Sequence, residues 1–234
     1  MTACWGIVPA AGSGQRMNEA QPKQYLKIAN HSLIEHSIAP LLQCPTIAAI
    51  FIALDTDDVH WQNISLKDNP RIKTCLGGAN RAQSVYNALM HIKADAEDWV
   101  LVHDAVRPCL QSDDLEYLIQ STWDDAVGAI LAIPINDSIK RVRRGANDRL
   151  CVVETLPRND LWMRAATPQM FRYQLLCEAL AQALSDAIEV DDEALAMQRL
   201  GHEVKIVAGD YRNIKVTYPA DMVNARRYLS DIKR

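Results

Sequence analysis

The sequence has 234 residues, of which 49% are hydrophobic and 23% are charged, and its formal net charge at pH 7 is −4. These proportions are typical of a folded globular protein that buries a sizeable core, and they exclude disordered and collagen-like chains. Because the chain is slightly acidic, it lacks the general basic field that attracts duplex nucleic acid, so an anionic ligand must be met by local clusters of Arg and Lys.

Five short apolar segments recur along the chain and are too uniformly apolar to be half-exposed antiparallel strands. They are "WGIVPA" (5–10), "IAAIFIAL" (47–54), "DWVLVHD" (98–104), "VGAILAIP" (127–134) and "EVKIVAG" (203–209). Such segments are typical of strands that are buried on both faces.

Helical patterns lie between these strands. They are "SLIEHSIAPLLQ" (32–43), "NRAQSVYNALMHI" (80–92), "SDDLEYLIQSTW" (112–123), "EALAMQRLG" (193–201) and "YPADMVNARRYL" (218–229). We expect Ser112 to be an N-cap, Gly201 to end its helix and Pro219 to lie in a first turn. The alternation predicts an α/β fold, a Rossmann-like three-layer sandwich with a mostly parallel central sheet.

One segment, at about residues 134–162, breaks this alternation. Its apolar runs are short, charges are frequent, and residues 145–148 have the composition of a hairpin tip. Two short strands that project from an α/β body are marginal alone, so we expect a β-arm that another surface stabilises, most simply a partner subunit. We expect residues 1–234 to form one domain that carries this arm.

Cysteine usage and hydropathy indicate the compartment. The six cysteines contain no CxxC pair and most lie among apolar neighbours, which is typical of buried free thiols in a reducing environment. The N-terminal residues lack the basic region of a secretion signal, and no apolar run reaches the roughly 18 residues of a membrane span. We expect a cytoplasmic protein that binds no membrane and no nucleic acid.

The loop after the first strand, "PAAGSGQRM", combines two glycines with nearby cations. Gly12 and Gly14 allow the backbone to approach a phosphate closely, and Arg16 and Lys23 can bind several phosphate oxygens, with Pro22 restricting the backbone before Lys23. Met17 does not complete a dinucleotide GxGxxG motif, and no GK[ST] follows, which disfavours a dehydrogenase or a Walker motif. A plain strand-to-helix turn is the structural alternative.

Three further segments carry candidate residues. In "VLVHDAVRP", Asp104 can bind Mg²⁺, directly or through water, or a ligand hydroxyl, although it can also simply cap the next turn. In "GGANRAQS", glycines precede a helix N-terminus, where a base or phosphate can bind. In "RNIKVTYP", alternation directs Lys215 away from its two apolar neighbours, and a solvated lysine is the alternative.

Taken together, "PAAGSGQRM", "PKQYL", "GGANRAQSV", "VHDAVRPC", "PRNDLW", "DDEA" and "NIKVT" occur in an order that resembles the 2-C-methyl-D-erythritol 4-phosphate cytidylyltransferases. The resemblance extends from the first strand to the last helix. It implies transfer of CMP from CTP to a methylerythritol phosphate with release of pyrophosphate, in isoprenoid precursor biosynthesis. It also implies a divalent cation such as Mg²⁺ and a homodimer that exchanges the β-arm.

The resemblance also implies roles for individual residues. The nucleotide-binding residues would be Ala10, Ala11, Gly12, Ser13, Gly14, Gly78, Ser84 and Asp104. The catalytic residues would be Arg16 and Lys23, which stabilise the transition state, and Arg158 and Lys215, which position the acceptor phosphate. The substrate-binding residues would be Arg107, Ser138, Arg158, Asp191 and Lys215, with Arg158 serving the neighbouring subunit.

The sequence departs from the family pattern at three positions. Ala79 stands where Asp is frequent, Ser138 replaces Thr, and Asp191 stands where Thr commonly precedes the acidic pair. A carboxylate about 4 Å from a phosphate costs roughly 4 kcal/mol at an effective dielectric near 20, so we expect Asp191 to turn away or to bind a hydroxyl.

Three rival functions remain open at this point. They are a cytidylyltransferase for another polyol phosphate such as ribitol 5-phosphate, a nucleotide-binding regulatory module without catalysis, and an NAD-dependent oxidoreductase. Binding and pyrophosphate-release assays separate them.

Overall fold

A mixed seven-stranded sheet forms the centre of the protein in the computed structural model, which describes residues 2–12, 21–157 and 161–231. Its strands, in spatial order, are β11 (Lys205–Ala208), β7 (Gly128–Pro134), β10 (Met163–Arg172), β6 (Trp99–Val102), β1 (Cys4–Pro9), β4 (Ile47–Leu54) and β5 (Ile72–Leu76). Neighbouring strands pair in parallel except at β10, which is antiparallel to both β6 and β7. The prediction of a mostly parallel central sheet is therefore confirmed.

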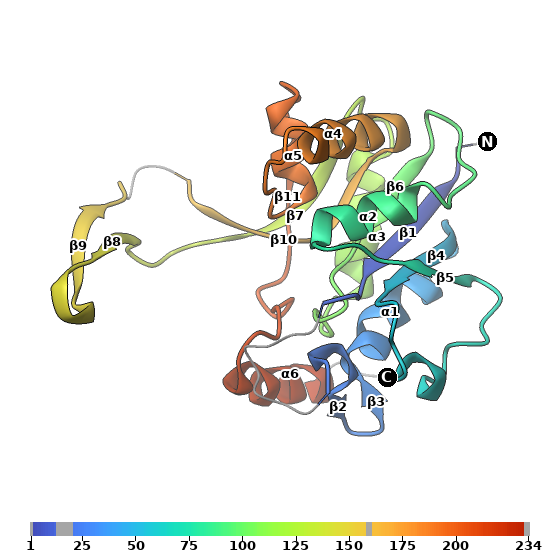
Figure 1. The fold of residues 1–234 in the computed structure, drawn as a ribbon, viewed down its shortest axis with the longest axis horizontal. Helices are drawn as coiled ribbons and strands as arrows, with labels where there is room; N and C mark the ends of the chain where they lie inside the picture. Colours follow the sequence, from blue (N-terminus) through green and yellow to red (C-terminus); the bar gives the residue numbers. More distant parts are fainter. Residues whose placement is uncertain (1, 13–20, 158–160, 232–234) are drawn as a thin grey trace.

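Helices cover both faces of this sheet (Figure 1). Helices α1 (Leu33–Gln43) and α3 (Ser112–Thr122) cover one face, and α2 (Arg81–Leu89), α4 (Tyr173–Ser185) and α5 (Glu193–Arg199) cover the other. A further helix, α6 (Pro219–Asp231), lies beside these layers. Consecutive β1 residues point to opposite faces, so Ile7 packs in one core cluster with α2, α4 and α5, and Val8 packs in another with α1 and α3. Within the described part of the chain, no helix combines the length and the apolar character that crossing a bilayer requires.

A smaller hydrophobic cluster lies beside the main layers. It joins α6 to the short strands β2 (Lys27–Ile28) and β3 (His31–Ser32), and it includes the buried Val106 and Val216. The backbone N–H of Val216 donates to the carbonyl of Val106 (2.9 Å). This bond places the chain before α6 alongside the loop that follows β6.

The helix boundaries follow from local capping. The hydroxyl of Ser32 accepts from the backbone N–H of Glu35, and the Glu35 carboxylate accepts from the backbone N–H of Ser32, which forms a capping box for α1. Gly201 follows α5 at φ +84°, and Pro219 opens α6, as predicted. The expectation for Ser112 was wrong, because Gln111 is the N-cap and Ser112 is the first helical residue.

Two sequence-based expectations about the sheet need correction. Segment 203–209 was expected to be buried on both faces. In the described part of the chain, however, β11 is an edge strand that pairs only with β7, and of its four residues only Val207 is buried. Strands β5 and β10 and helix α4 were not predicted. β10 combines buried polar side chains with a charged start, and this weakens the apolar pattern by which buried strands are detected.

The β-arm lies outside the central sheet and projects far from it (Figure 1). It consists of β8 (Lys140–Arg144) and β9 (Leu150–Thr155), joined by the short 3-10 helix η4 (Ala146–Asp148), within the predicted segment. Its apolar side chains Val142, Leu150 and Val152 are exposed. A two-stranded ribbon of this kind buries too little apolar surface to be stable by itself.

Candidate active site

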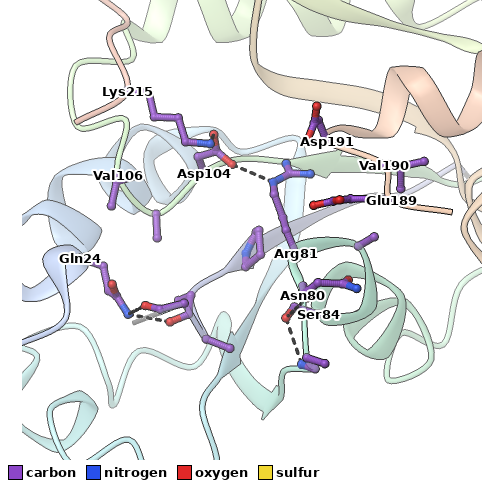
Figure 2. Close-up of a pocket in the computed structure, with 18 of the residues that line it drawn as sticks. Gln24, Asn80, Arg81, Ser84, Asp104, Val106, Glu189, Val190, Asp191 and Lys215 are labelled. Carbon is purple, nitrogen blue, oxygen red and sulfur yellow. Dashed lines mark hydrogen bonds and ion pairs between the residues drawn. The ribbon is translucent and has the colours of Figure 1, made fainter. Parts of the chain in front are cut away.

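A cavity of about 570 Å³ opens at the carboxyl ends of the parallel strands (Figure 2). Loops after β1, β5 and β6 form its floor, and residues 188–191, which precede α5, form a further wall. The strands that follow β1 in the sequence are added on both sides of it: β4 and β5 lie on one side, and β6 lies on the other. Ligands of open α/β sheets bind at such a switch point.

Most of the predicted site residues that the structure describes line this cavity. On the nucleotide side they are Ala10, Ala11, Gly12, Gly78, Ser84 and Asp104. Lys23, Asp191 and Lys215 line it as well. Ser13, Gly14, Arg16 and Arg158 lie outside the described residues.

The loop after β1 is held by a side chain that sequence reasoning did not single out. Gln24 is buried, and its Nε2 donates to the carbonyls of Ala10 (2.7 Å) and Gly12 (3.2 Å) (Figure 2). A Cβ built on Gly12 would meet open space, so the cavity is open at this position. Gln24 lies next to Lys23 in the 3-10 helix η2 (Lys23–Tyr25), so it ties Lys23 to the loop.

The second glycine-rich loop packs closely against the first. A Cβ on Gly77 would clash with the Cβ of Ala11, and one on Gly78 would clash with the side chain of Gln83, so close packing explains both glycines. Ser84 Oγ accepts from the backbone N–H of Gly78 (3.0 Å) and donates to the carbonyl of Asn80 (2.9 Å). Ser84 thereby shapes the wall that faces the cavity.

Lys23 and its helix η2 close one side of the cavity. Pro22 is the N-cap of η2, and its carbonyl accepts from the backbone N–H of Tyr25 (3.0 Å). The Tyr25 hydroxyl donates to Asp58 (2.6 Å), which anchors the far side of η2. The Nζ of Lys23 donates to the carbonyl of Val216 (3.3 Å), the residue that follows Lys215 in the sequence.

Asp104 is the centre of a buried cluster of charges. Its Oδ1 lies 3.0 Å from Nε of Arg81, and its Oδ2 lies 3.0 Å from Nζ of Lys215 and 3.3 Å from Nε of Arg107. Burial alone raises the pKa of Asp104, but the charges of Arg81, Lys215 and Arg107 outweigh burial and hold its pKa well below the usual range. Asp104 is therefore a permanent anion that holds three cations.

Arg81 and Glu193 extend this cluster, and sequence reasoning missed their role. The guanidinium of Arg81 binds the Glu193 carboxylate with both terminal nitrogens (2.6 and 3.0 Å). Glu193 has no exposed surface. An acidic residue in the first turn of a helix favours the helix dipole, and this local role gives no sign of a pairing with a residue 112 positions away. The neighbouring Asp192 is the residue that caps α5.

His103 is next to Asp104 in the chain and is not among the described residues that line the cavity. It is fully buried, its Nδ1 contacts the Thr167 hydroxyl (3.0 Å), and its Nε2 contacts the carbonyl of Arg107 (3.3 Å). Burial lowers the pKa of His103 to about 4, so the ring is neutral at pH 7. The Thr167 hydroxyl also accepts from the backbone N–H of Asp104 (3.0 Å), which fixes that residue's backbone.

Lys215 lies where alternation predicted that it would, although residues 212–217 lie outside the sheet. Val216 is fully buried, whereas the Lys215 side chain is 41% exposed and points to Asp104. Lys215 is therefore not a purely solvated lysine, because it forms an ion pair with Asp104 at the cavity wall (Figure 2).

Two predicted substrate-binding residues are not among the described residues that line the cavity. Arg107 is buried, and besides its contact with Asp104 its guanidinium donates from Nη1 to the carbonyl of Asn213 (2.9 Å). Ser138 is exposed at the base of the β-arm, where a second cavity of about 310 Å³ is lined by residues 134–139, 156–157 and 161–163. The structure therefore places Ser138 apart from the nucleotide loops of its own chain.

The donor set bears on the expected metal. Among the described residues, no group of three or more His, Cys, Asp or Glu side chains is placed to hold an ion. Both oxygens of Asp104 already accept from cations. A single carboxylate of this kind fits an ion that is bound mainly by the phosphates of a substrate, since Mg²⁺ keeps several waters and few protein ligands in such sites.

A family model and curated relatives give the same family name for nearly the full length of the chain. A family model described as 2-C-methyl-D-erythritol 4-phosphate cytidylyltransferase matches residues 4–231. Proteins of that name from Laribacter hongkongensis and Pseudomonas fluorescens are 44% and 42% identical over 230 and 225 residues. These alignments cover 98% and 95% of this chain, and 97% and 94% of the relatives.

Solved structures show the same similarity in three dimensions. The crystal structure of the Francisella tularensis 2-C-methyl-D-erythritol 4-phosphate cytidylyltransferase is 33% identical, with a TM-score of 0.83 over 97% of this chain and 100% of that one. A 4-diphosphocytidyl-2C-methyl-D-erythritol synthase is 31% identical, with a TM-score of 0.83 over 98% of this chain and 99% of that one.

Proposed function

The chain belongs to the 2-C-methyl-D-erythritol 4-phosphate cytidylyltransferase family, and we propose that it transfers CMP from CTP to 2-C-methyl-D-erythritol 4-phosphate. The products are 4-diphosphocytidyl-2-C-methyl-D-erythritol and pyrophosphate. The observation that supports this function best is a single cavity in which two small-residue loops face a preformed cluster of cations around Asp104.

The reaction needs charge neutralisation more than proton transfer. A phosphate oxygen of the acceptor forms a bond to the α-phosphorus of CTP, and the bond from that phosphorus to the bridging oxygen of pyrophosphate breaks. The attacking oxygen is already ionised, so no general base is required, and the neutral, buried His103 is not among the described residues that line the cavity. Positioning and electrostatic stabilisation then supply most of the rate enhancement.

The cations are positioned before any substrate arrives. Lys215 is held by Asp104 at 3.0 Å, and Lys23 is held by the carbonyl of Val216 at 3.3 Å. Because these contacts orient the ammonium groups, little reorganisation is needed as negative charge develops on the transferring phosphoryl group. Arg16, which lies outside the described residues, has the same transition-state role by resemblance to the family.

The proposed cofactor is Mg²⁺ or another divalent cation. When bound, it would neutralise charge on the triphosphate and polarise the leaving group. Asp104 is the described residue that would hold it, through water, since direct ligation would compete with Arg81 and Lys215 for the carboxylate oxygens. Asp104 itself keeps those cations in place.

The proposed assembly is a homodimer that exchanges the β-arm. Two observations support it: the arm exposes apolar side chains outside the central sheet, and Ser138 at its base lies apart from its own chain's nucleotide loops. In an exchanged dimer, Ser138 and Arg158 of one chain serve the acceptor site of the other. We also propose a cytoplasmic location, because all six cysteines are free thiols and four of them are buried.

A substrate panel tests the proposed function. Purified protein with CTP, Mg²⁺ and methylerythritol phosphate should release pyrophosphate, and ribitol 5-phosphate should serve as the comparison acceptor. Asp191 lines the cavity with an exposed side chain, so the acceptor preference tests whether its carboxylate is tolerated there. Pyrophosphate release with ribitol 5-phosphate alone would reject the proposed acceptor, and CTP binding without release would reject catalysis.

A further inference from the structure

A carboxylate that does not face the cavity is joined to its charge cluster. Glu193 is the first residue of α5 and has no exposed surface. A buried carboxylate is costly unless it is fully paired, and here the pair is the two-pronged contact with Arg81. This contact orients the planar guanidinium, so the direction of its third donor, Nε, is determined as well.

That third donor binds Asp104, which lines the cavity. Nε of Arg81 donates to Oδ1 of Asp104 at 3.0 Å, and the other oxygen of Asp104 remains for Lys215 at 3.0 Å. Successive contacts therefore connect Glu193 to Arg81, Arg81 to Asp104, and Asp104 to the partly exposed side chain of Lys215. Figure 2 shows Arg81 and Lys215 on either side of Asp104.

We propose that Glu193 is a positioning residue for the transfer reaction: by binding Arg81 it fixes the orientation of Asp104, and through Asp104 it holds Lys215 at the cavity. The inference deepens the function proposed above and rests on it. Without its fork to Glu193, the guanidinium of Arg81 binds the remaining carboxylate, Asp104, through both oxygens. Lys215 is then displaced from Oδ2.

A purely structural role would make Glu193 only a link between α5 and α2. The first turn of α5 has a separate attachment to the sheet, however. The side chain of Gln169 accepts from the backbone N–H of Ala194 (3.0 Å) and donates to Asp192 (3.1 Å). Because this attachment does not involve Glu193, the position of α5 and the orientation of Arg81 can be separated by substitution.

The first test is Glu193→Gln, which keeps the shape of the side chain and removes its charge. We expect kcat for pyrophosphate release to fall by about tenfold to a hundredfold, because small displacements of a positioning group have costs of this size. The KM for CTP should stay within about threefold, because the nucleotide loops are untouched. Glu193→Asp keeps the charge on a shorter side chain, so its kcat should be higher than that of Glu193→Gln. An unchanged kcat in Glu193→Gln overturns the proposal.

Glu35→Gln is the matched control for removing a buried carboxylate. Glu35 also lies in the first turn of a helix, but it bonds to Ser32 and Ser65 and is not among the described residues that line the cavity. This variant should lose stability and keep its kinetic constants. If both variants lose kcat in proportion to their stability, Glu193 is structural only and the proposal is wrong.

A double substitution tests the route through Arg81. In an Arg81→Gln background, adding Glu193→Gln should change kcat by no more than about twofold, because the link that transmits its effect is already broken. Losses that multiply would show that Glu193 acts independently and would overturn the route. If Glu193→Gln does not fold, Arg81→Lys tests the same link, since it keeps the charge and loses the fork. It should lower kcat about tenfold with little effect on the KM for CTP, and an unchanged kcat would reject the proposal.

A crystal structure of Glu193→Gln gives a readout that needs no substrate. We expect Nζ of Lys215 to leave hydrogen-bonding distance of Asp104, and an intact pair at the present distance overturns the proposal. This arm separates the two ideas. If the unmodified protein releases no pyrophosphate from CTP with any acceptor, the proposed function fails, while the Asp104–Lys215 geometry in the variant still decides the positioning role.

Discussion

Asp104 illustrates how an acidic residue can serve a site for anions. The carboxylate does not attract phosphate. It binds Arg81, Arg107 and Lys215 at 3.0 to 3.3 Å, and these ion pairs fix the positions of the three cationic side chains. With Glu193 included, the cluster has three cations and two anions, so its own net charge is positive. Such a preorganised charge is worth more in a partly buried site than the same charges on a mobile surface.

At the residue scale, Lys23→Ala tests transition-state stabilisation. The Lys23 ammonium is oriented by the carbonyl of Val216 at the cavity wall, so its loss should lower kcat about 10² to 10³-fold. CTP affinity should change much less, because the backbone loops at Ala10–Gly12 and Gly78 are retained. Steady-state kinetics together with CTP binding by calorimetry measure the two effects, and near-normal turnover would remove Lys23 from the catalytic role.

At the element scale, the start of α1 contains another buried carboxylate with a different purpose. Glu35 accepts from Ser32 within its own capping box, and its other oxygen accepts from the hydroxyl of Ser65 (2.5 Å). It therefore fastens the helix to the segment that connects η3 (Trp61–Asn63) with β5. Hydrogen bonds of this kind stabilise the ionised form of a carboxyl group.

The pH dependence of stability tests this arrangement. Burial raises the pKa of Glu35, but the hydrogen bonds from Ser65 and Ser32 outweigh it and lower the pKa from 4.5 to about 2. Because the folded-state pKa is the lower one, the stabilisation is complete above pH 4.5 and is lost as the pH falls toward 2. Urea unfolding of Glu35→Gln should show a free energy of unfolding lower by about 2 kcal/mol at pH 7 and a smaller difference near pH 2.5. An equal difference at both values would contradict the role of the charge.

At the scale of the whole molecule, the β-arm is the feature that the single chain leaves without support. Among the described strands, β8 and β9 pair only with each other, and apolar side chains on both are exposed. Ser138 lies at its base, apart from the cavity that most of the other described site residues line. An exchanged arm would bury this surface and bring Arg158 to the partner's acceptor site.

Mixing two inactive variants tests sharing of the site. Lys23→Ala and Arg158→Ala chains should each be inactive, but a heterodimer contains one site with both residues intact. Because about half of randomly assorted dimers are heterodimers, and each has one active site of two, mixing should restore about a quarter of the activity. Native mass spectrometry provides the control that heterodimers form, and no recovery in their presence would show that the sites are not shared.

Local patterns were sufficient for much of the fold. Apolar segments such as 98–104 are long enough to indicate buried strands. Gly201 marks a helix end because other residues adopt its positive φ poorly, and Pro219 marks a helix start because the first turn does not need the N–H that proline lacks. They were insufficient for β10, whose antiparallel position depends on pairing with β6 and β7, and for the exposure of β11, which depends on its being an edge strand.

The candidate site divides in the same way. By itself, the sequence determined which segments carry the chemistry, because the glycines, Lys23, Asp104 and Lys215 occur in short motifs next to strand ends. Only the tertiary structure decided that Gln24 anchors the first loop and that Glu193 meets Arg81. The physical reason is that hydrogen bonds and ion pairs between distant residues depend on where the sheet places its strand ends, and no local preference of the chain encodes that placement.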